Sequence, residues 1–220
     1  MDRRLWLEEK RDEIRSLYDR VFAVDYDRRF PTTSQTHQTF LKHVLNHLRD
    51  DAWILDAGCG TGKYWPDIFD RGLGVVGIDQ SEQMLWRARE KFPPIRTGLS
   101  GIQEFEELNA YEAVLCIDVL DLVAPEDWQL GLGNFLRALK PGGMLYFTVE
   151  NADPADIDFA YEEARRHHLP VVIGEVAHAG YYHYHPPGEQ VIAFLQDVGF
   201  TPTHHGVGGG YTHYLASKAE

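Results

Sequence analysis

The chain is poor in cysteine and has no long apolar run. Only Cys59 and Cys116 occur among 220 residues, so we expect no disulfide framework and two reduced thiols. No apolar run reaches the roughly 18 residues that a membrane span requires. The first ten residues carry basic side chains without an apolar segment, so they do not form a secretory signal. These absences predict a cytoplasmic protein that has no membrane partner.

Basic residues are also scarce. The sequence has 21 Lys and Arg against 34 Asp and Glu, which gives a net charge of −13. Proteins that bind nucleic acids usually carry a basic patch, whereas the basic residues here are scattered in pairs such as 28–29 and 165–166. We therefore expect no nucleic acid partner and favour a small molecule, neutral or cationic. Solubility alone would also explain the acidity.

A glycine-rich segment follows a short apolar strand near the first quarter of the chain. The predicted strand over 53–57 is followed by three glycines at alternate positions, beginning at Gly58, and by a predicted helix over 61–71. Such a loop brings bare backbone N–H groups up to a ligand at a helix N-terminus. About twenty residues further on, a second apolar run ends in Asp79, where a carboxylate can accept from both ribose hydroxyls. The two runs predict the nucleoside-binding half of an α/β fold.

The loop departs from the pattern that binds dinucleotides. That pattern is G-x-G-x-x-G, and Lys63 occupies the place of its third glycine. Asp56, two residues before Gly58, would repel a pyrophosphate and attract a ligand that carries an ammonium group. S-adenosylmethionine fits, because it has a ribose, an adenine, an ammonium and a sulfonium and no phosphate.

Predicted strands and helices alternate along the rest of the chain. Further strands are expected over 74–79, around 95, over 113–117 and 144–149, further helices over 82–91, 126–139 and 188–198, and a closing hairpin over 200–218. The alternation predicts a doubly wound, mostly parallel α/β sheet with helices on both faces. We expect one domain over 1–220, divided into an N-terminal helix or lid (1–36), a core (37–149), an insertion near the acceptor site (150–187) and a closing helix and hairpin (188–220).

Four segments, in this order and at this spacing, resemble the successive motifs of class I S-adenosylmethionine-dependent methyltransferases: 54–64, 76–85, 113–123 and 139–149. The resemblance covers roughly residues 35–218. It implies a seven-stranded sheet in the order 3-2-1-4-5-7-6 with the last strand antiparallel, S-adenosylmethionine as the cofactor and S-adenosylhomocysteine as the product. It also implies a set of cofactor-binding residues: Tyr26, Asp56, Gly58, Gly60, Asp79, Gln80, Met84, Gly101, Ile102, Ile117 and Asp118.

The resemblance assigns roles to these residues. Gly58 and Gly60 pass beneath the methionine part of the cofactor, Asp56 helps to hold its ammonium indirectly, and Asp79 takes the ribose hydroxyls. Tyr26 lies in an N-terminal segment that family members often fold over the cofactor, although simple packing on the sheet is an equal alternative.

The adenine side shows one departure from the family. Gln80 and Met84 flank the ring by resemblance, but no acidic residue follows the third strand to bind the adenine amino group. Ser100 or a backbone carbonyl is the expected substitute, with Gly101 and Ile102 against the ring.

The fourth strand ends beside the sulfonium by resemblance, at Ile117 and Asp118. Methyltransferases that act on exocyclic amines of DNA bases or on protein glutamine carry Asn/Asp-Pro-Pro-Tyr there, and this sequence does not. The carboxylates of a magnesium-dependent catechol methyltransferase are not recognisable either.

The insertion ends in a run of Tyr and His. His183 and His185 alternate, so an extended segment would place both on one face, and either is a candidate general base. Together with His178 they would supply nitrogen ligands to a metal, but no matching carboxylate or cysteine cluster accompanies them, and no metal is assigned. The alternative is a packed aromatic strand beside the site.

The sequence therefore predicts an S-adenosylmethionine-dependent methyltransferase, monomeric or homodimeric, that acts on an oxygen or nitrogen of a small-molecule acceptor. Two alternatives stay open: a non-catalytic S-adenosylmethionine-binding protein or partner subunit, and an NAD(P)-binding oxidoreductase.

Overall fold

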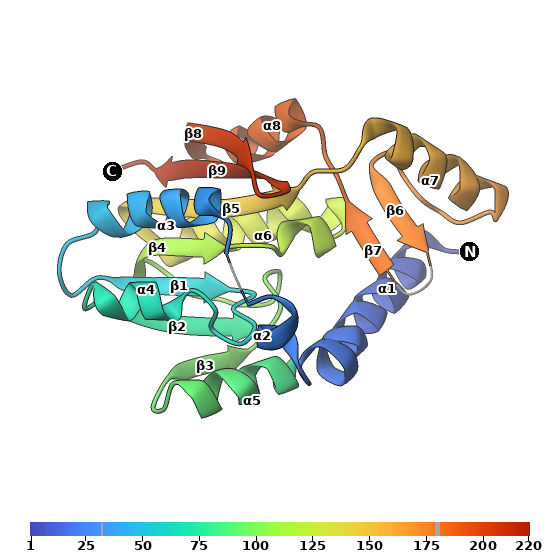
Figure 1. Cartoon of the computed structure of the whole chain (residues 1–220). Helices are drawn as coiled ribbons and strands as arrows, with labels where there is room; N and C mark the ends of the chain where they lie inside the picture. Colours follow the sequence, from blue (N-terminus) through green and yellow to red (C-terminus); the bar gives the residue numbers. More distant parts are fainter. Residues whose placement is uncertain (32, 179–180) are drawn as a thin grey trace.

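Strands and helices alternate along most of the chain in the computed structural model, which describes residues 1–31, 33–178 and 181–220 (Figure 1). The strands are β1 Trp53–Ala57, β2 Gly74–Asp79, β3 Arg96–Leu99, β4 Tyr111–Cys116, β5 Leu139–Glu150, β6 Glu175–His178, β7 Tyr181–Tyr184, β8 Phe200–Gly208 and β9 Tyr211–Lys218. The helices are α1 Arg3–Leu17, α2 Tyr26–Arg29, α3 Gln35–His47, α4 Trp65–Asp70, α5 Glu82–Lys91, α6 Pro125–Ala138, α7 Pro154–Arg166 and α8 Gly188–Val198. Two single turns join them, the π-helical η1 Tyr18–Phe22 and the 3-10 helical η2 Leu120–Leu122.

The main sheet has the strand order β3-β2-β1-β4-β5-β9-β8. β1 pairs in parallel with both β2 and β4, and β9 runs antiparallel to both β5 and β8. This is the order 3-2-1-4-5-7-6 with an antiparallel last strand, so the predicted fold class is confirmed. Because the order reverses between β1 and β4, a crevice forms beyond the carboxyl ends of these strands, where ligands of such folds bind.

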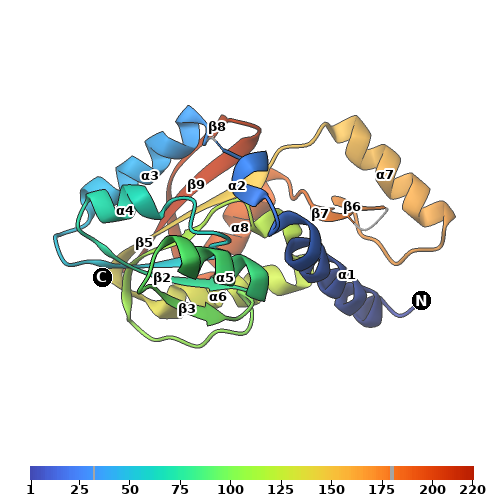
Figure 2. The same ribbon diagram turned by 60° about the horizontal axis from the view of Figure 1, so that its bottom comes forward.

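Helices cover both faces of the sheet, as Figures 1 and 2 show. One face packs against α3, α4 and α5, and the other against α1, α6 and α8. The side chains of β4 alternate between the two cores. Val114 and Cys116 pack on the face that α6 and α8 cover, and Ala113 and Leu115 pack on the face that α3 and α4 cover. The strand is therefore buried on both faces, as its continuous apolar run predicts.

The segment after β1 is helical over a shorter span than predicted. A helix was expected over 61–71, but α4 covers only Trp65–Asp70. Gly62 has a φ of 75°, which a right-handed helix does not contain, and the residues before α4 form turns instead. The glycines thus shape a wide loop, and α4 begins only after it.

The sequence also predicts helix caps in the run 32–34 and at Ser81 and Gly199, and these are better reproduced. Ser34 and Ser81 are the N-caps of α3 and α5, and their side chains accept from the backbone N–H groups of His37 and Met84. Gly199 ends α8 in the left-handed conformation, with a φ of 109°. Thr32, part of the predicted capping run, lies outside the described residues.

The insertion forms α7 and a two-stranded sheet of β6 and β7, which the sequence did not predict. In both views this small sheet lies beside α1, at the end of the molecule away from α3 and α4 (Figures 1 and 2). Among the described helices, none is long and apolar enough to cross a membrane.

The core of β4 gives a test of this packing. Leu115 is fully buried between the sheet and α3, so Leu115→Ala should lower the free energy of unfolding by about 2–5 kcal/mol in urea titrations. Leu108 is 72% exposed, and Leu108→Ala should change that free energy by less than about 0.5 kcal/mol. Equal effects of the two substitutions would contradict the packing described.

Candidate functional site

One pocket opens at the carboxyl ends of β1, β2 and β4. It is lined by every residue predicted to hold the cofactor: Tyr26, Asp56, Gly58, Gly60, Asp79, Gln80, Met84, Gly101, Ile102, Ile117 and Asp118. The structure therefore brings together residues that are up to 92 positions apart in the chain (Asp118 and Tyr26, 118 − 26 = 92). Their convergence follows from the strand order, because the ends of adjacent parallel strands meet at one edge.

The glycine loop is closed onto the neighbouring strand. The backbone N–H groups of Gly58 and Cys59 both donate to the carbonyl of Ile78, at 2.8 and 3.0 Å, and that of Gly60 donates to Asp79 Oδ2 at 2.8 Å. The expectation that these groups face a ligand is thus wrong: each already has a partner inside the protein. An anionic ligand such as a pyrophosphate would find no free donor among them.

Asp79, at the end of β2, is held from both sides. Its Oδ1 accepts from the backbone N–H of Ser81 at 2.8 Å, while Oδ2 accepts from Gly60. Burial raises the pKa of Asp79 to about 6, although these hydrogen bonds act in the opposite direction. Each carboxylate oxygen has a second lone pair, so the fixed carboxylate can still accept from two hydroxyls on neighbouring carbons.

Asp56 lies deeper, at the end of β1. Its side chain is almost fully buried, and Oδ2 accepts from the indole N–H of Trp65 at 2.8 Å. Burial raises the pKa of Asp56 to about 7, and the Trp65 hydrogen bond only partly offsets it. A cation near this group would favour its ionised form.

Asp118 follows β4 in a strained backbone conformation. Its φ of 60° is uncommon for a residue other than glycine, and its N–H donates to Thr148 Oγ1 at 2.7 Å. His37 Nε2 lies 2.9 Å from Asp118 Oδ1, and Tyr64 Oη donates to Oδ2 at 3.3 Å. Ser34 Oγ in turn lies 2.7 Å from His37 Nδ1. No sequence motif identifies His37, because it precedes the first strand and lies outside the four family segments.

The adenine side keeps its predicted residues and adds one. Met84 is buried on α5, and Gly101 and Ile102 follow β3 directly. Ser100 lines the pocket, as proposed for the missing acidic residue, and so does Gln103.

The N-terminal segment forms another wall of the pocket. Leu7 and Ile14 of α1, Tyr18 of η1 and Tyr26 of α2 line it, so the helix predicted as a lid does reach the site. Two carboxylates fasten this segment. The first is Asp19, whose Oδ1 accepts from the hydroxyl of Ser81 at 2.6 Å. Ser81 is the residue that caps α5.

The second fastening carboxylate is Asp27. Its Oδ1 accepts from the hydroxyl of Thr61 at 2.6 Å, and its Oδ2 pairs with Lys91 Nζ at 2.8 Å. The segment is therefore attached to the glycine loop as well as to α5. The sequence pattern identified neither contact, since each joins residues more than 30 positions apart.

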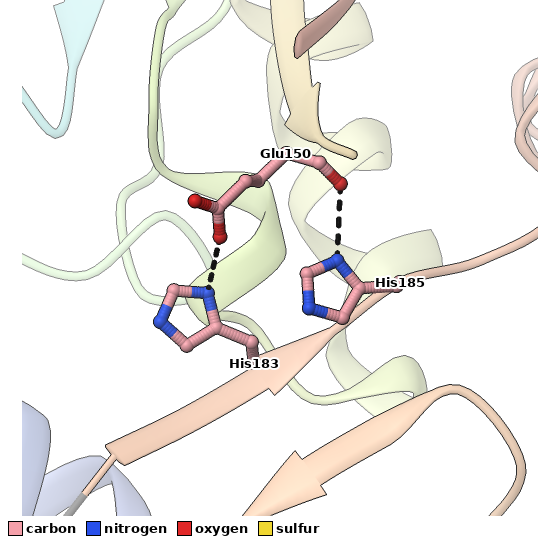
Figure 3. Close-up of side chains that lie close together, drawn as sticks. All are labelled: Glu150, His183 and His185. Carbon is pink, nitrogen blue, oxygen red and sulfur yellow. Dashed lines mark hydrogen bonds and ion pairs between the residues drawn. The ribbon is translucent and has the colours of Figure 1, made fainter. Parts of the chain in front are cut away.

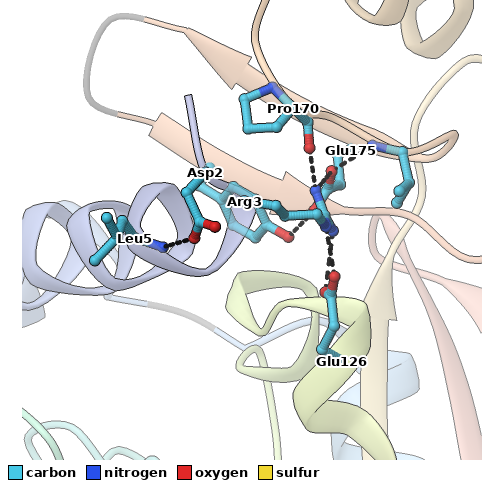
Figure 4. A network of polar contacts seen from close by, with 8 residues as sticks. Asp2, Arg3, Leu5, Glu126, Pro170 and Glu175 are labelled. Atoms are coloured by element: carbon cyan, nitrogen blue, oxygen red, sulfur yellow. Dashed lines mark hydrogen bonds and ion pairs between the residues drawn. The ribbon is translucent and has the colours of Figure 1, made fainter.

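A buried ion pair joins α1 to the insertion (Figure 4). The Glu175 side chain is fully buried, and its two oxygens accept from Arg3 Nη1 and Nη2 at 2.9 Å each. Tyr182 Oη and the N–H of Val172 also donate to Glu175, at 2.6 and 2.7 Å, so the carboxylate is fully satisfied. Arg3 also contacts Glu126 of α6. Removing one partner of such a buried pair lowers the free energy of unfolding by about 3–5 kcal/mol, so this pair holds α1 firmly in its position over the pocket.

The two histidines predicted as general bases do not line the pocket. They do share one face of the β6–β7 hairpin, as their alternation predicts, with parallel rings 5.7 Å apart. His183 Nδ1 lies 3.2 Å from Asp121 Oδ2 and 3.0 Å from Glu150 Oε2. Burial lowers the pKa of His183, but the two carboxylates outweigh it and raise that pKa to about 9, so the imidazole is protonated near neutral pH and a poor base. The side chain of His178, considered with them as a metal ligand, lies outside the described residues.

The chain resembles known proteins along this region. Residues 54–143 match the family model of a methyltransferase domain. The chain is 30% identical over 137 residues to YqeM of Bacillus subtilis, covering 60% of this chain and 55% of that protein. It is 27% identical over 144 residues to the ubiquinone biosynthesis O-methyltransferase of Aliivibrio fischeri, covering 62% of this chain and 61% of that one. The chain thus spans about half the length of the curated relatives that it matches.

A solved structure shares the whole architecture. The 1,6-didemethyltoxoflavin-N1-methyltransferase of Burkholderia thailandensis aligns with a TM-score of 0.72 at 18% identity, over 97% of this chain and 91% of that one. At this identity the likeness shows the fold alone.

The tight loop can be tested at Gly58. A methyl group there would lie 2.3 Å from Val119 Cγ2, and the residue has a φ of 77°. Gly72→Ala is the matched control, because Gly72 has a φ of 70° and nothing within 4 Å of an added Cβ. We expect Gly72→Ala to lower the free energy of unfolding by about 1–2 kcal/mol and Gly58→Ala to lower it clearly further.

The double variant Gly58→Ala/Val119→Ala should recover part of the additional loss, since it removes the clashing methyl groups. Urea titration measures Gly58→Ala, Val119→Ala, the double variant and the Gly72→Ala control. Strictly additive effects of the two substitutions would contradict the contact between Gly58 and Val119.

Proposed function

We propose that this chain, whose residues 54–143 match a methyltransferase domain, is a class I S-adenosylmethionine-dependent methyltransferase that transfers the cofactor's methyl group to an oxygen or nitrogen atom of a small molecule. The observation that carries the proposal is the convergence of all the predicted cofactor residues on one pocket. The Burkholderia enzyme of the same fold has S-adenosylhomocysteine and its acceptor bound, which supports this use of the architecture.

The arrangement of carboxylates supports the orientation of the cofactor. Asp79 is fixed to accept from the ribose hydroxyls, and Asp56 lies on the side where the ammonium of the methionine part would be held. The adenine would then lie between Met84 and the segment after β3, and the sulfonium would face Asp118. Three carboxylates along one ligand favour a cationic cofactor.

The same contacts weaken the case for an NAD(P)-binding oxidoreductase. A pyrophosphate needs backbone donors at the glycine loop, and those of Gly58, Cys59 and Gly60 are already engaged. The adjacent Asp56 would also repel it.

Methyl transfer from a sulfonium is an in-line displacement at carbon, so the protein mainly has to align the acceptor behind the methyl group. Such alignment contributes about 7–11 kcal/mol in well-oriented systems. Leu7 and Ile14 of α1 and Leu122 of η2 supply apolar surface to the pocket, which favours an acceptor with an apolar part. A lid built from α1 would also exclude water from the sulfonium.

Deprotonation of the acceptor is not assigned to His183 or His185, because neither lines the pocket. We infer a cytoplasmic enzyme from the two buried, free cysteines. A small-molecule acceptor without nucleic acid suits the acidic chain.

The proposal is tested by incubating the chain with S-adenosylmethionine and a broad panel of phenols, carboxylic acids and amines, and by detecting S-adenosylhomocysteine and methylated product by mass spectrometry. We expect S-adenosylhomocysteine and methylated product to form with the members of one acceptor class and not with the others. Asp79→Ala should weaken cofactor binding by about 10–100-fold, because a charged hydrogen-bond acceptor is lost, whereas the exposed control Asp70→Ala should not.

Tight binding of S-adenosylmethionine without transfer to any acceptor would instead favour the non-catalytic alternative. That protein would act as a sensor of the cofactor or as a partner subunit.

The pKa values of the two buried carboxyl groups predict a pH dependence. A bound ammonium favours ionised Asp56 and so lowers its pKa from about 7, which means that binding releases a proton below that pH. The affinity for S-adenosylhomocysteine should therefore rise from about pH 5.5 to 7.5, below the range in which its α-amino group is deprotonated.

Adenosine is the control ligand for this experiment, because it keeps the ribose and lacks the ammonium. Its affinity should rise only with ionisation of Asp79 and level off above about pH 6. Isothermal titration calorimetry measures both ligands. An affinity for S-adenosylhomocysteine that falls with rising pH over this range would contradict the placement of its ammonium near Asp56.

A further inference from the structure

We propose that Glu150, His183 and His185 bind a divalent transition-metal ion, with Asp121 orienting His183. The three residues come from the end of β5 and from the second strand of the insertion hairpin and the residue after it (Figure 3). One ligand atom of each lies within 4.8 Å of the others. The inference goes beyond the proposed function, because none of the four residues lines the cofactor pocket.

The orientation of His185 favours coordination. Its Nδ1 lies 3.0 Å from the backbone carbonyl of Glu150, and it donates its proton there (Figure 3). In the neutral imidazole this leaves Nε2 as a lone-pair donor, and ligating histidines usually have their other ring nitrogen bonded in this way. Glu150 therefore has two roles, because its backbone carbonyl orients His185 and its side-chain carboxylate is one of the three proposed ligands.

The surroundings of His183 give a second, independent observation. Its Nδ1 lies within 3.2 Å of carboxylate oxygens of both Asp121 and Glu150, yet makes no hydrogen bond of normal geometry. The Asp121 side chain is only 5% exposed, and its Oδ1 is buried without a hydrogen-bond partner. Buried carboxylates are normally satisfied, so the unpaired oxygen of Asp121 indicates that positive charge is missing from its surroundings.

A bound dication would supply positive charge here and would displace one of the two protons that the His183 imidazolium otherwise carries. Two carboxylates close to one imidazole carry two negative charges, and a single divalent ion balances them. An Asp next to a ligating imidazole is also the usual arrangement that fixes the ring and raises its basicity. Two imidazoles beside one carboxylate favour Zn²⁺, Mn²⁺ or Fe²⁺ over Mg²⁺ and Ca²⁺, which prefer oxygen ligands.

The position of the group indicates what the ion would do. Glu150 belongs to the main sheet, Asp121 to η2, and the two histidines to the insertion. An ion held between them would fasten the insertion to the sheet next to η2, whose Leu122 lines the pocket. With three protein ligands it would keep at least one open position.

The test uses the full chain, stripped with a chelator, and Zn²⁺ as the probe. We expect calorimetry to show one tightly bound Zn²⁺ per chain, little binding of Mg²⁺, and a rise in melting temperature with Zn²⁺. Glu150→Gln and His185→Gln should each weaken Zn²⁺ binding by more than about 10-fold, and Asp121→Asn by about 10–100-fold.

A second histidine pair provides the matched control. His43 and His47 are exposed on α3, one turn apart, with ring centroids 4.3 Å from each other, so they form a surface pair able to bind Zn²⁺ adventitiously. The variant His43→Gln/His47→Gln should keep the tight site. The proposal is overturned if the wild type binds no Zn²⁺ beyond what this control loses, or if a folded Glu150→Gln variant binds as the wild type does. Circular dichroism checks folding, and the wild-type titration decides the matter if the variants do not fold.

Discussion

The site depends on three carboxylates that adjacent strands bring to one edge of the sheet. Asp56, Asp79 and Asp118 come from the ends of β1, β2 and β4 and line a single pocket. Burial raises the pKa of the first two, and the charge of Asp79 adds to the shift at Asp56, so a ligand that carries positive charge would favour the ionised carboxylates. The closed glycine loop adds to this preference, because its N–H groups are turned to the protein and offer nothing to a phosphate. A methyl-sulfonium cofactor meets both conditions.

The wall formed by the N-terminal segment is coupled to the same elements. Asp19 contacts the residue that caps α5, and Asp27 contacts the glycine loop, so displacement of this segment would disturb the groups that surround Asp79. The Arg3–Glu175 pair extends the coupling to the insertion. Polar contacts thus join the N-terminal segment to the glycine loop, to α5 and to the insertion, so a displacement of this segment would disturb all three.

Local patterns explain which parts of this site could be predicted. The apolar strand, the glycines and Asp79 could be predicted because they are close in sequence and one ligand requires all of them. The caps Ser81 and Gly199 could be predicted because Ser and Gly are typical of helix ends. The contacts of His37 with Asp118 and of Arg3 with Glu175 join residues 81 and 172 positions apart, and no local spacing encodes them. The direction of the loop N–H groups could not be predicted for a related reason: their acceptors, the carbonyl of Ile78 and the carboxylate of Asp79, belong to another strand.

The central claim, a pocket for S-adenosylmethionine, is tested most directly by thermal unfolding with S-adenosylmethionine, S-adenosylhomocysteine, NADH and NADPH at equal concentration. A ligand present at 100 times its Kd adds about 2.7 kcal/mol of stability, which raises the melting temperature measurably. We predict a rise with the two sulfur-containing ligands and none with the dinucleotides. A rise with a dinucleotide alone would contradict it and assign Asp79 to a different ribose.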